Sequence, residues 1–372
     1  MKGTYSCKEL AEKFKFDGEL INSELHICGH INNTHILNFK NEDGNINKYI
    51  LQRINTDVFP NVEWLMSNID RITRHISKKV KEAGGDTTRE SLRLIETKDD
   101  KLYYETEDGD YFRAYHFIDG ASTYMKVENP MDFYKCGKAL GKFQEQLSDF
   151  PADTVYEIIP DFHNTAKRYK DFLEAVKKDE FGRASSVKSE IDFIVTREEE
   201  TERLVNLLAE GKLPLRVTHN DTKFNNIMID DITGEAICVI DLDTVMPGLS
   251  LYDFGDSIRS GATTALEDEV DLTKVNFDIN LFDLFTKGFL ESCGRSLTKC
   301  EIDNLAFSCK LITLELAMRF LMDHINGDAY FQIHRPNHNL DRARNQLKLV
   351  SDMEEQMDQM NEIVNKYSSM FL

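Results

Sequence analysis

The spacing of apolar residues changes once along the chain, near residue 120, and this change restricts the folds available. Before that point, short segments alternate apolar and polar residues, which is typical of strands. Segments 33–39 and 48–54 are joined across an Asp-Gly pair, a strong hairpin signal, and 91–97, 101–107 and 111–118 follow. The helical segment 62–85 interrupts them and ends in two glycines. We therefore expect a sheet of about five strands with one helix in residues 1–120.

Residues 121–372 follow a helical period instead. The expected helices lie in 131–150, 171–179, 201–211, 280–292, 302–325 and 340–367, and one hairpin, 225–230 with 236–243, interrupts them. A small antiparallel-sheet N-lobe followed by a larger, mostly helical C-lobe with one embedded β-hairpin is the order of an α+β, protein-kinase-like two-lobe fold. We expect residues 1–120 to bind nucleotide, and residues 121–372 to carry the catalytic loop, the metal site and the acceptor site.

Charge and cysteine usage exclude several classes of partner. The formal net charge of −20 argues against nucleic acid and anionic membranes as partners. No apolar run approaches the ~18 residues of a membrane span, and the N-terminal stretch lacks the apolar core of a secretory signal. The seven cysteines form no Cys-x-x-Cys pair. This pattern fits reduced thiols and a cytoplasmic location.

A group of polar residues lies between two apolar runs in segment 216–230. Its part "HNDTKFNN" places Asn226 five residues after Asp221. This is the spacing of the kinase catalytic loop, in which Asp accepts the proton of the attacking hydroxyl and Asn binds a metal ion. The spacing alone occurs often by chance. Because a hairpin whose second strand ends in Asp-x-Asp follows it, we expect Asp221 to be the catalytic base of a phosphoryl transfer.

The second strand of that hairpin ends in Asp241 and Asp243, whose spacing would put both on one face of a strand. Mg²⁺ binds through a few protein oxygens and completes its octahedron with phosphate oxygens and water. We therefore expect Asp241 and Asn226 to bind Mg²⁺.

A literal Asp-Phe-Gly occurs at 253–255, but it follows a Pro-Gly break and does not end the hairpin. We therefore expect Asp253 to bind backbone amides and brace the catalytic loop. His219 is expected to hold the backbone of the same loop and not to transfer a proton.

These motifs resemble a phosphotransferase family that includes aminoglycoside phosphotransferases, choline kinases and homoserine kinases. Its H-x-D-x-x-x-x-N and I-D-x-x motifs match "HNDTKFNN" and "IDLD". Longer strings, among them "GHINNTHIL", "IDLDTVMPG" and "LYDFGDSIR", are similar to a smaller group, the N-acetylhexosamine 1-kinases, along nearly the whole chain. The resemblance implies ATP as co-substrate and Mg²⁺ as cofactor. It also implies transfer to the anomeric hydroxyl of N-acetylglucosamine or N-acetylgalactosamine, giving the sugar 1-phosphate and ADP.

On matching positions, the resemblance implies that Asp243 is a further Mg²⁺ ligand and that 28–34 forms a turn over the phosphates. The connector at about 116–120 would present backbone groups to adenine. The implied ATP-binding residues are Gly29, His30, Asn32, Asn33, Thr34, Ile50, Gln52, His116, Phe117 and Ile118.

One position departs from the kinase pattern. The strand at 48–54 should present a Lys to the α- and β-phosphates. Its alternation puts Ile50 and Gln52 on one face and Leu51 and Arg53 on the other, so Gln52 takes the Lys position. Gln can donate a hydrogen bond but carries no charge. Neutralising the phosphates therefore falls to Arg53, to a residue elsewhere or to the metal.

A neutral sugar is recognised through hydrogen bonds to its hydroxyls, with Arg or carboxylate partners giving direction. Besides Asp221, the resemblance favours Arg319 as a sugar contact, with Asp256 and Tyr330 as further candidates. Each has a plainer alternative: Arg319 could pair with Glu315 one turn away, Asp256 could cap a helix, and Tyr330 could belong to the core.

Two other functions stay open. A choline or amino-alcohol kinase would need an aromatic and acidic cage for the ammonium group, which no short motif supplies. A nucleotide-binding regulator without catalysis is suggested by Gln52, whereas Asp221, Asn226 and Asp241 together argue against it. Monomer and homodimer are both compatible with the sequence.

Overall fold

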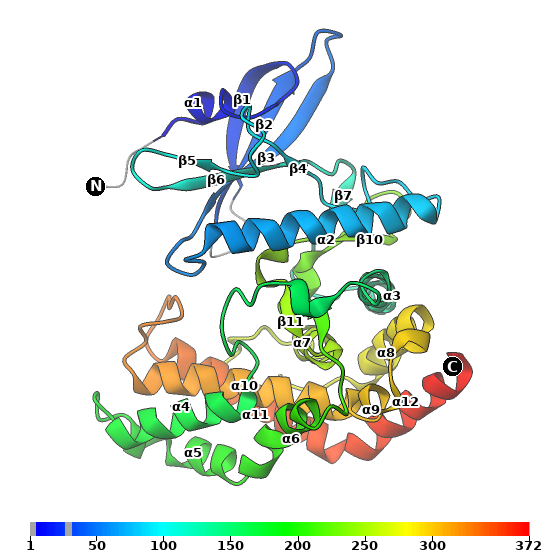
Figure 1. Cartoon of the computed structure of the whole chain (residues 1–372). Coiled ribbons are helices and arrows are strands. Elements are labelled where there is room, and N and C mark those ends of the chain that lie inside the picture. Colours follow the sequence, from blue (N-terminus) through cyan, green and yellow to red (C-terminus); the bar gives the residue numbers. More distant parts are fainter. Residues whose placement is uncertain (1–4, 27–31, 372) are drawn as a thin grey trace.

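The computed structural model describes residues 5–26 and 32–371. A sheet with one long helix lies above a larger group of helices (Figure 1). The upper part is an antiparallel-sheet N-lobe and the lower part a mostly helical C-lobe. The expected α+β, protein-kinase-like fold is thus confirmed.

Six strands make up the N-lobe sheet in the described part of the chain. They are β1 (Glu19–His26), β2 (Asn33–Lys40), β3 (Ile46–Ile54), β4 (Leu94–Ile95), β5 (Tyr104–Glu105) and β6 (Tyr111–His116). Their order is β1-β2-β3-β6-β4, with β5 also paired to β6. The expectation of about five strands was short because β1 is exposed along nearly its whole length and shows no apolar alternation. A short helix, α1 (Cys7–Ala11), was also not expected.

Helix α2 (Val62–Glu82) was expected and lies below the sheet (Figure 1). The side chain of Asn61 caps its first turn, and an apolar stripe at helical spacing is buried. Asn68 on the buried face donates hydrogen bonds to the carbonyls of Tyr156 (2.8 Å) and Val245 (3.1 Å). The helix is thereby tied to the C-lobe.

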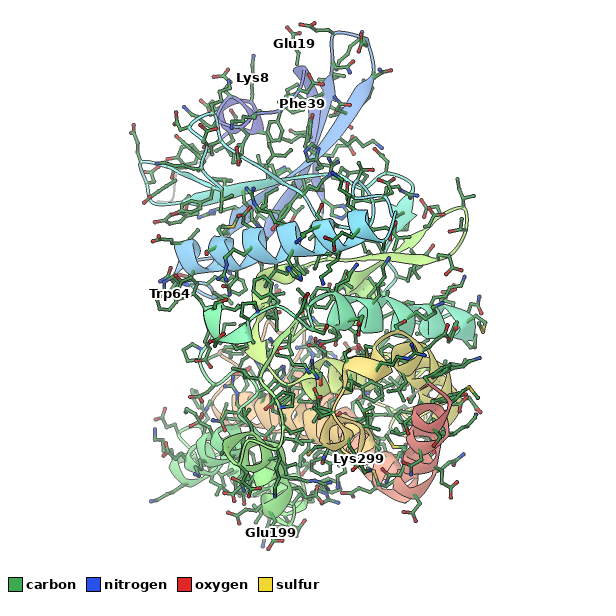
Figure 2. All side chains as sticks on the ribbon, turned by 45° about the vertical axis from the view of Figure 1, so that its right-hand side comes forward. Lys8, Glu19, Phe39, Trp64, Glu199 and Lys299 are labelled. Atoms are coloured by element: carbon green, nitrogen blue, oxygen red, sulfur yellow. The ribbon has the colours of Figure 1, made fainter. Side chains whose placement is uncertain are left out.

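Two buried clusters divide the interior near α2. A small one lies within the sheet around Phe39, which Figure 2 shows near the top of the molecule. A much larger one combines residues of α2, such as Leu65 and Ile69, with residues of the C-lobe such as Phe254. This large cluster therefore contains residues of both lobes.

The C-lobe helices are α3 (Pro130–Gln146), α4 (Thr165–Lys178), α5 (Lys188–Val195), α6 (Glu198–Ala209), α7 (Ser250–Gly261), α8 (Ile279–Cys293), α9 (Lys299–Ile302), α10 (Leu305–Ile325), α11 (His338–Glu355) and α12 (Met357–Phe371). The single helix expected over 340–367 is wrong, since α11 and α12 are separated at Gln356. The break lets Met360 and Val364 of α12 join the large cluster. Helix α10 is buried on nearly all sides, which marks it as the centre of the lobe.

Short strands surround the segment between α6 and α7. The expected hairpin consists of β9 (Ile227–Asp230) and β10 (Ala236–Val239), and β7 (Ala121–Ser122) pairs with β9. A second antiparallel pair, β8 (Arg216–Thr218) with β11 (Met246–Gly248), was not indicated by the sequence. The loop 219–226 therefore leaves one strand pair and enters the other.

Candidate active site

Asp253 on α7 holds the loop 219–226 from one side. Its fully buried carboxylate accepts hydrogen bonds from the backbone N–H groups of His219 (2.9 Å) and Asn220 (2.7 Å). Asn220 has a left-handed backbone (φ 64°), at a point where two successive N–H groups reach the same carboxylate. The side-chain amide of Gln144 binds it as well. The prediction that Asp253 binds backbone amides and braces the loop 219–226 is confirmed.

His219 fixes the loop from the other side. Its Nε2 lies 2.8 Å from the carbonyl of Ile240, and its Nδ1 accepts the N–H of Asp221 at 3.2 Å. An accepting Nδ1 places the ring proton on Nε2, which therefore donates to Ile240. Both ring nitrogens are occupied by backbone groups, so the predicted holding role of His219 is confirmed.

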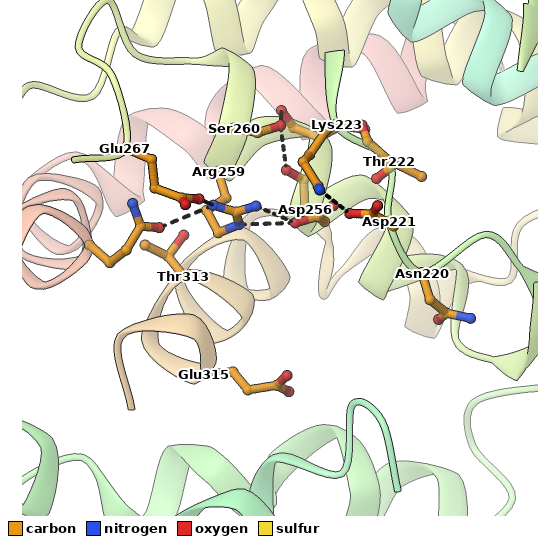
Figure 3. Close-up of polar contacts among 12 residues, drawn as sticks. Asn220, Asp221, Thr222, Lys223, Asp256, Arg259, Ser260, Glu267, Thr313 and Glu315 are labelled. Carbon is orange, nitrogen blue, oxygen red and sulfur yellow. Dashed lines mark hydrogen bonds and ion pairs between the residues drawn. The ribbon is translucent and has the colours of Figure 1, made fainter. Parts of the chain in front are cut away.

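Asp221 presents its half-buried carboxylate from this braced loop (Figure 3). Its Oδ1 lies 3.0 Å from Nζ of Lys223, and this neighbouring negative charge raises the pKa of Lys223 to about 12. The side-chain amide of Asn226 donates to the carbonyl of Asp221 (2.7 Å) and lies 3.3 Å from its Oδ2. The Asp–x4–Asn spacing thus brings the side chains of Asp221 and Asn226 next to each other.

Asp241 and Asp243 do not share a strand face, contrary to the expectation, because β10 ends at Val239. Asp241 adopts a left-handed conformation (φ 61°, ψ 60°) and starts a short 3₁₀ turn over Leu242–Thr244. The turn leaves Asp241 exposed on one side and buries Asp243. Desolvation by the protein around it, together with the charges of Asp243 and Asp221, raises the pKa of Asp241 to about 6. The charges of Asp243 and Asp221 therefore both act on the carboxylate of Asp241.

The residues fit Mg²⁺. Among the described residues, the carboxylate of Asp241 has no hydrogen-bond or ion-pair partner, and none donates to Oδ1 of Asn226. Asp243, in contrast, is already paired with a guanidinium. The described part of the chain holds no cluster of three or more His, Cys, Asp or Glu side chains able to hold a metal ion. A site of one or two protein oxygens suits an ion whose remaining ligands are phosphate oxygens and water.

The residue just before β2 contacts Asp243 from the N-lobe. Gly29 and His30 lie outside the described residues, and Asn33 is exposed. The side-chain amide of Asn32 donates to Oδ2 of Asp243 at 2.6 Å, which links positions 211 residues apart. Asn32, which lies within the expected phosphate turn 28–34, therefore contacts Asp243; residues 28–31 of that turn lie outside the described residues.

The predicted faces of β3 are present. Ile50 and Gln52 are half-buried on one face, and Nε2 of Gln52 donates to the buried hydroxyl of Thr34 at 3.0 Å. Arg53 points the other way, to Asp110 at 2.6 Å. Arg53 is therefore not available to neutralise a phosphate near Asp243.

A site residue that the sequence analysis missed lies opposite Gln52. Arg113 of β6 is 1% exposed and contacts Asp243 through both terminal nitrogens, at 2.5 and 2.8 Å. Burial alone would lower its pKa, but the charge of Asp243 outweighs burial and raises it. The detectable signal was a single Arg within the apolar strand segment "YFRAYHF".

Three amides of the connector after β6 have no hydrogen-bond partner in the described part of the chain. The N–H groups of His116 and Phe117 donate to the carbonyls of Arg93 (3.0 Å) and Lys48 (3.2 Å), whereas those of residues 118–120 have no acceptor there. Burial and the charge of Arg93 lower the pKa of His116 to about 4, so its ring is neutral near pH 7. Among the residues expected to bind ATP, Ile118 is thus one with an amide that has no partner in the described part of the chain.

Arg319 of α10 does not pair with Glu315, so that alternative is wrong. Glu315 is bound instead by Nδ1 of His163, at 3.0 Å. The guanidinium of Arg319 lies over the rings of Phe162, Tyr330 and Phe331, at 5.4, 5.9 and 5.5 Å from their centres. No described residue forms a hydrogen bond or ion pair with it. Arg319 is thus a half-buried cation surrounded by aromatic rings.

His163, which no sequence pattern indicated, connects this aromatic region to the loop 219–226. Its Nε2 lies 3.3 Å from the carbonyl of Asn220, and its ring packs on Tyr252. Burial lowers its pKa, but the charge of Glu315 outweighs burial, and the pKa of His163 is raised overall.

Asp256 and Tyr330 occupy different environments. Asp256 lies within α7, not at its start, so the helix-cap alternative is wrong; its Oδ1 binds Arg259 at 2.8 Å, close to Asp221 and Lys223 (Figure 3). The buried Oδ2 of Asp256 has no hydrogen-bond partner in the part of the chain that the structure describes. Tyr330 is 70% exposed, which excludes the core alternative.

The fold and the loop geometry define a kinase-like phosphotransferase. The chain belongs to the phosphotransferase enzyme family, APH, whose profile matches residues 38–284. It is a small-molecule kinase of the group that includes aminoglycoside phosphotransferases and choline kinases.

Solved structures share the fold at low sequence identity. An aminoglycoside phosphotransferase from Alicyclobacillus acidocaldarius is similar with a TM-score of 0.64 and 13% identity, over 98% of each chain. A microcompartment-associated aminopropanol kinase gives 0.58 and 13%, over 95% of this chain and 97% of the other. An amicoumacin kinase in complex with AMP-PNP, Ca²⁺ and Ami gives 0.57 and 12%, over 94% and 92%. No described helix is long and apolar enough to cross a membrane.

Proposed function

We propose that this kinase transfers the γ-phosphate of ATP to the anomeric hydroxyl of an N-acetylhexosamine, N-acetylglucosamine or N-acetylgalactosamine. The observation that carries the choice of acceptor is the guanidinium of Arg319, which has no hydrogen-bond or ion-pair partner among the described residues. It fills the space between three aromatic rings with a positive charge and free N–H donors. An ammonium group of choline or an amino alcohol would be repelled there, whereas the hydroxyls and acetamido carbonyl of a neutral sugar accept hydrogen bonds.

The reaction needs one proton acceptor, and a carboxylate is a strong enough base for the anomeric hydroxyl. This hydroxyl is more acidic than the other sugar hydroxyls because the ring oxygen stabilises its alkoxide. In the proposed step, Asp221 takes the hydroxyl proton while the oxygen bonds to the γ-phosphorus. The bond between that phosphorus and the β–γ bridging oxygen breaks, and ADP leaves with the electron pair.

Asp241 and Asn226 would hold Mg²⁺, which supplies charge neutralisation of the phosphates when bound. Asp253 and His219 keep the base in place by fixing the backbone on both sides of it. Holding a base in reach of its proton is a substantial share of such catalysis.

The test is ADP release with a panel of acceptors: both N-acetylhexosamines, the methyl glycoside of N-acetylglucosamine, choline, aminopropanol and homoserine. The methyl glycoside is the matched control because it lacks only the free anomeric hydroxyl. We expect turnover with a free N-acetylhexosamine and none with the glycoside, and a phosphorus NMR signal of the product coupled to the anomeric proton. Turnover of the glycoside, or turnover with choline or aminopropanol alone, would overturn the proposal.

A further inference from the structure

The strand pairing places Arg113 where it can replace the missing phosphate lysine. Gln52 of β3 lies directly opposite Arg113 of β6 in the antiparallel register. Side chains of directly opposite residues leave the same face of a sheet, about 5 Å apart at Cβ. The two are in contact, since Nε of Arg113 donates to Oε1 of Gln52 at 3.1 Å.

The guanidinium of Arg113 lies next to the acidic residues near the end of β10. Its guanidinium faces the carboxylate of Asp243, and Asp243 follows Asp241 by two residues. Nη1 of Arg113 lies 2.5 Å from Oδ1 of Asp243, and Nη2 donates to Oδ2 at 2.8 Å, so one carboxylate occupies both arms of the guanidinium. A phosphate group presents the same kind of paired oxygen acceptors, so it can replace the carboxylate on these two arms.

The neutral residue at position 52 follows from the same geometry. A Lys there would put a second positive charge beside Arg113 in a buried setting, which is costly. Gln52 instead uses its oxygen for Arg113 and its amide for Thr34, and so orients the guanidinium. The pair Gln52 and Arg113 thus contains one positive charge, as the usual Lys position does.

We propose that Arg113 is the residue that binds the nucleotide phosphates, and that Asp243 holds it in position until the nucleotide arrives. This inference rests on the proposed use of ATP and is independent of the acceptor. Because an Arg fork can bind two phosphate oxygens at once, it suits a site between the α- and β-phosphates.

The test measures equilibrium binding of AMP-PNP and of adenosine by calorimetry, in Mg²⁺ and without any acceptor. Arg113→Gln is expected to weaken AMP-PNP binding about 10- to 100-fold, the range for a charged hydrogen bond, and to leave adenosine binding within about threefold. Gln52→Lys combined with Arg113→Gln returns one charge to the neighbouring strand and should recover most of the loss. Arg53→Gln, on the opposite face of β3, is the matched control and should bind AMP-PNP like the wild type.

Several results would overturn the proposal. They are unchanged AMP-PNP binding in Arg113→Gln, an equal loss for adenosine, which indicates a merely structural pair, and no recovery in the double variant. If Arg113→Gln does not fold, Arg113→Lys retains a charge and should show a smaller loss confined to AMP-PNP; a Lys variant that binds like the wild type or loses adenosine equally would contradict the assignment. A failure of the sugar proposal would leave all these binding constants unchanged.

Discussion

Asp221 owes its position to backbone contacts made by other residues. Asp253 binds the amides on its N-terminal side, and the ring of His219 accepts the amide of Asp221 itself. Its carboxylate makes a long contact with the amide of Asn226 (3.3 Å) and a half-exposed ion pair with Lys223, and such pairs are worth at most about 1 kcal/mol. Changing the carboxylate should therefore affect catalysis and leave the loop intact.

Asp221→Asn is expected to lower kcat about 10²- to 10⁴-fold, the usual share of general-base catalysis. Because the amide keeps the shape of the carboxylate, the Kd for AMP-PNP should stay within about threefold of the wild type. Kinetics with the best acceptor measures kcat, and calorimetry measures the Kd for AMP-PNP. Asp231→Asn, an exposed residue of the hairpin turn, is the control and should change neither. A kcat within tenfold of the wild type would refute the base assignment.

Single residues were predictable from the sequence where their partners are close in the chain or belong to a motif. The roles of Asp253 and His219 follow from spacing around the hairpin, and both were confirmed. Arg113 was not predictable, since its partner Asp243 lies 130 positions away. The pairing of Arg319 with Glu315 was wrong because His163, 152 positions from Glu315, takes that carboxylate. Helical spacing permits a contact but does not show which partner competes for it.

Glu301 joins three elements of the C-lobe. It completes a capping box with Thr298 at the start of α9, and it binds Arg216 of β8 through both oxygens, at 2.5 and 2.8 Å. It also accepts the hydroxyl of Ser250 on α7. Burial would raise the pKa of Glu301, but Arg216, the amide of Thr298 and Ser250 outweigh burial and lower it.

Glu301→Gln should lower the free energy of unfolding at pH 7 by about 2–4 kcal/mol, because it breaks a buried ion pair on one side. The folded-state pKa is lowered, so the ionic part is fully present above the unfolded value of about 4.3 and is lost as pH falls through it toward the folded value. The difference between wild type and variant should therefore shrink between pH 6 and pH 3. Urea unfolding across that range measures it, with Glu210→Gln, an exposed pair with Lys212, as control. A difference that grows toward low pH would contradict the argument.

Helices α3 and α8 pack with their backbones in near contact. A Cβ on Gly288 would lie 2.2 Å from the carbonyl oxygen of Tyr134, and one on Gly137 would lie 2.4 Å from that of Phe285. Such a carbonyl cannot move aside without shifting its helix. Glycine at these positions therefore permits the approach.

Gly288→Ala should lower the free energy of unfolding by about 1–3 kcal/mol, since overpacking outweighs the better helix propensity of Ala. Asn280→Ala, at an exposed position of α8, should change it by no more than about 0.5 kcal/mol. Urea unfolding of both variants is sufficient. A more stable Gly288→Ala protein would show that the helices can separate at no cost.

Elements were predictable where one face is buried over several turns, as in α2, whose start at residue 62 was expected. Strand β1 was not predictable, because nearly every residue of it is exposed. Its sequence therefore lacks the alternation of apolar and polar residues that identifies a half-buried strand. The break at Gln356 was also missed, because both halves of 340–367 keep the same helical spacing. When the apolar spacing is the same before and after a break, the spacing does not show where one helix ends and the next begins.

The molecule as a whole joins its lobes through a shared core and through Asp243. Leu65 and Ile69 of α2 belong to the same buried cluster as C-lobe residues such as Phe254. Asn32 and Arg113 of the N-lobe both reach Asp243 of the C-lobe. A ligand bound at this junction contacts both lobes and should stabilise them as one unit.

AMP-PNP with Mg²⁺ should therefore raise the unfolding free energy of the entire chain, by about 2.7 kcal/mol at 100 times its Kd. Two probes follow this: far-ultraviolet circular dichroism, dominated by the C-lobe helices, and fluorescence of the single tryptophan, Trp64, which stacks on Tyr156 at 5.0 Å between α2 and the C-lobe. Both midpoints should rise together, since the buried cluster that spans both lobes makes their unfolding cooperative. EDTA should remove most of the rise, and Asp241→Ala should remove the same metal-dependent part. A rise in one probe alone would mean that the lobes unfold separately, and an unchanged rise in EDTA would mean that the metal does not link the nucleotide to Asp241.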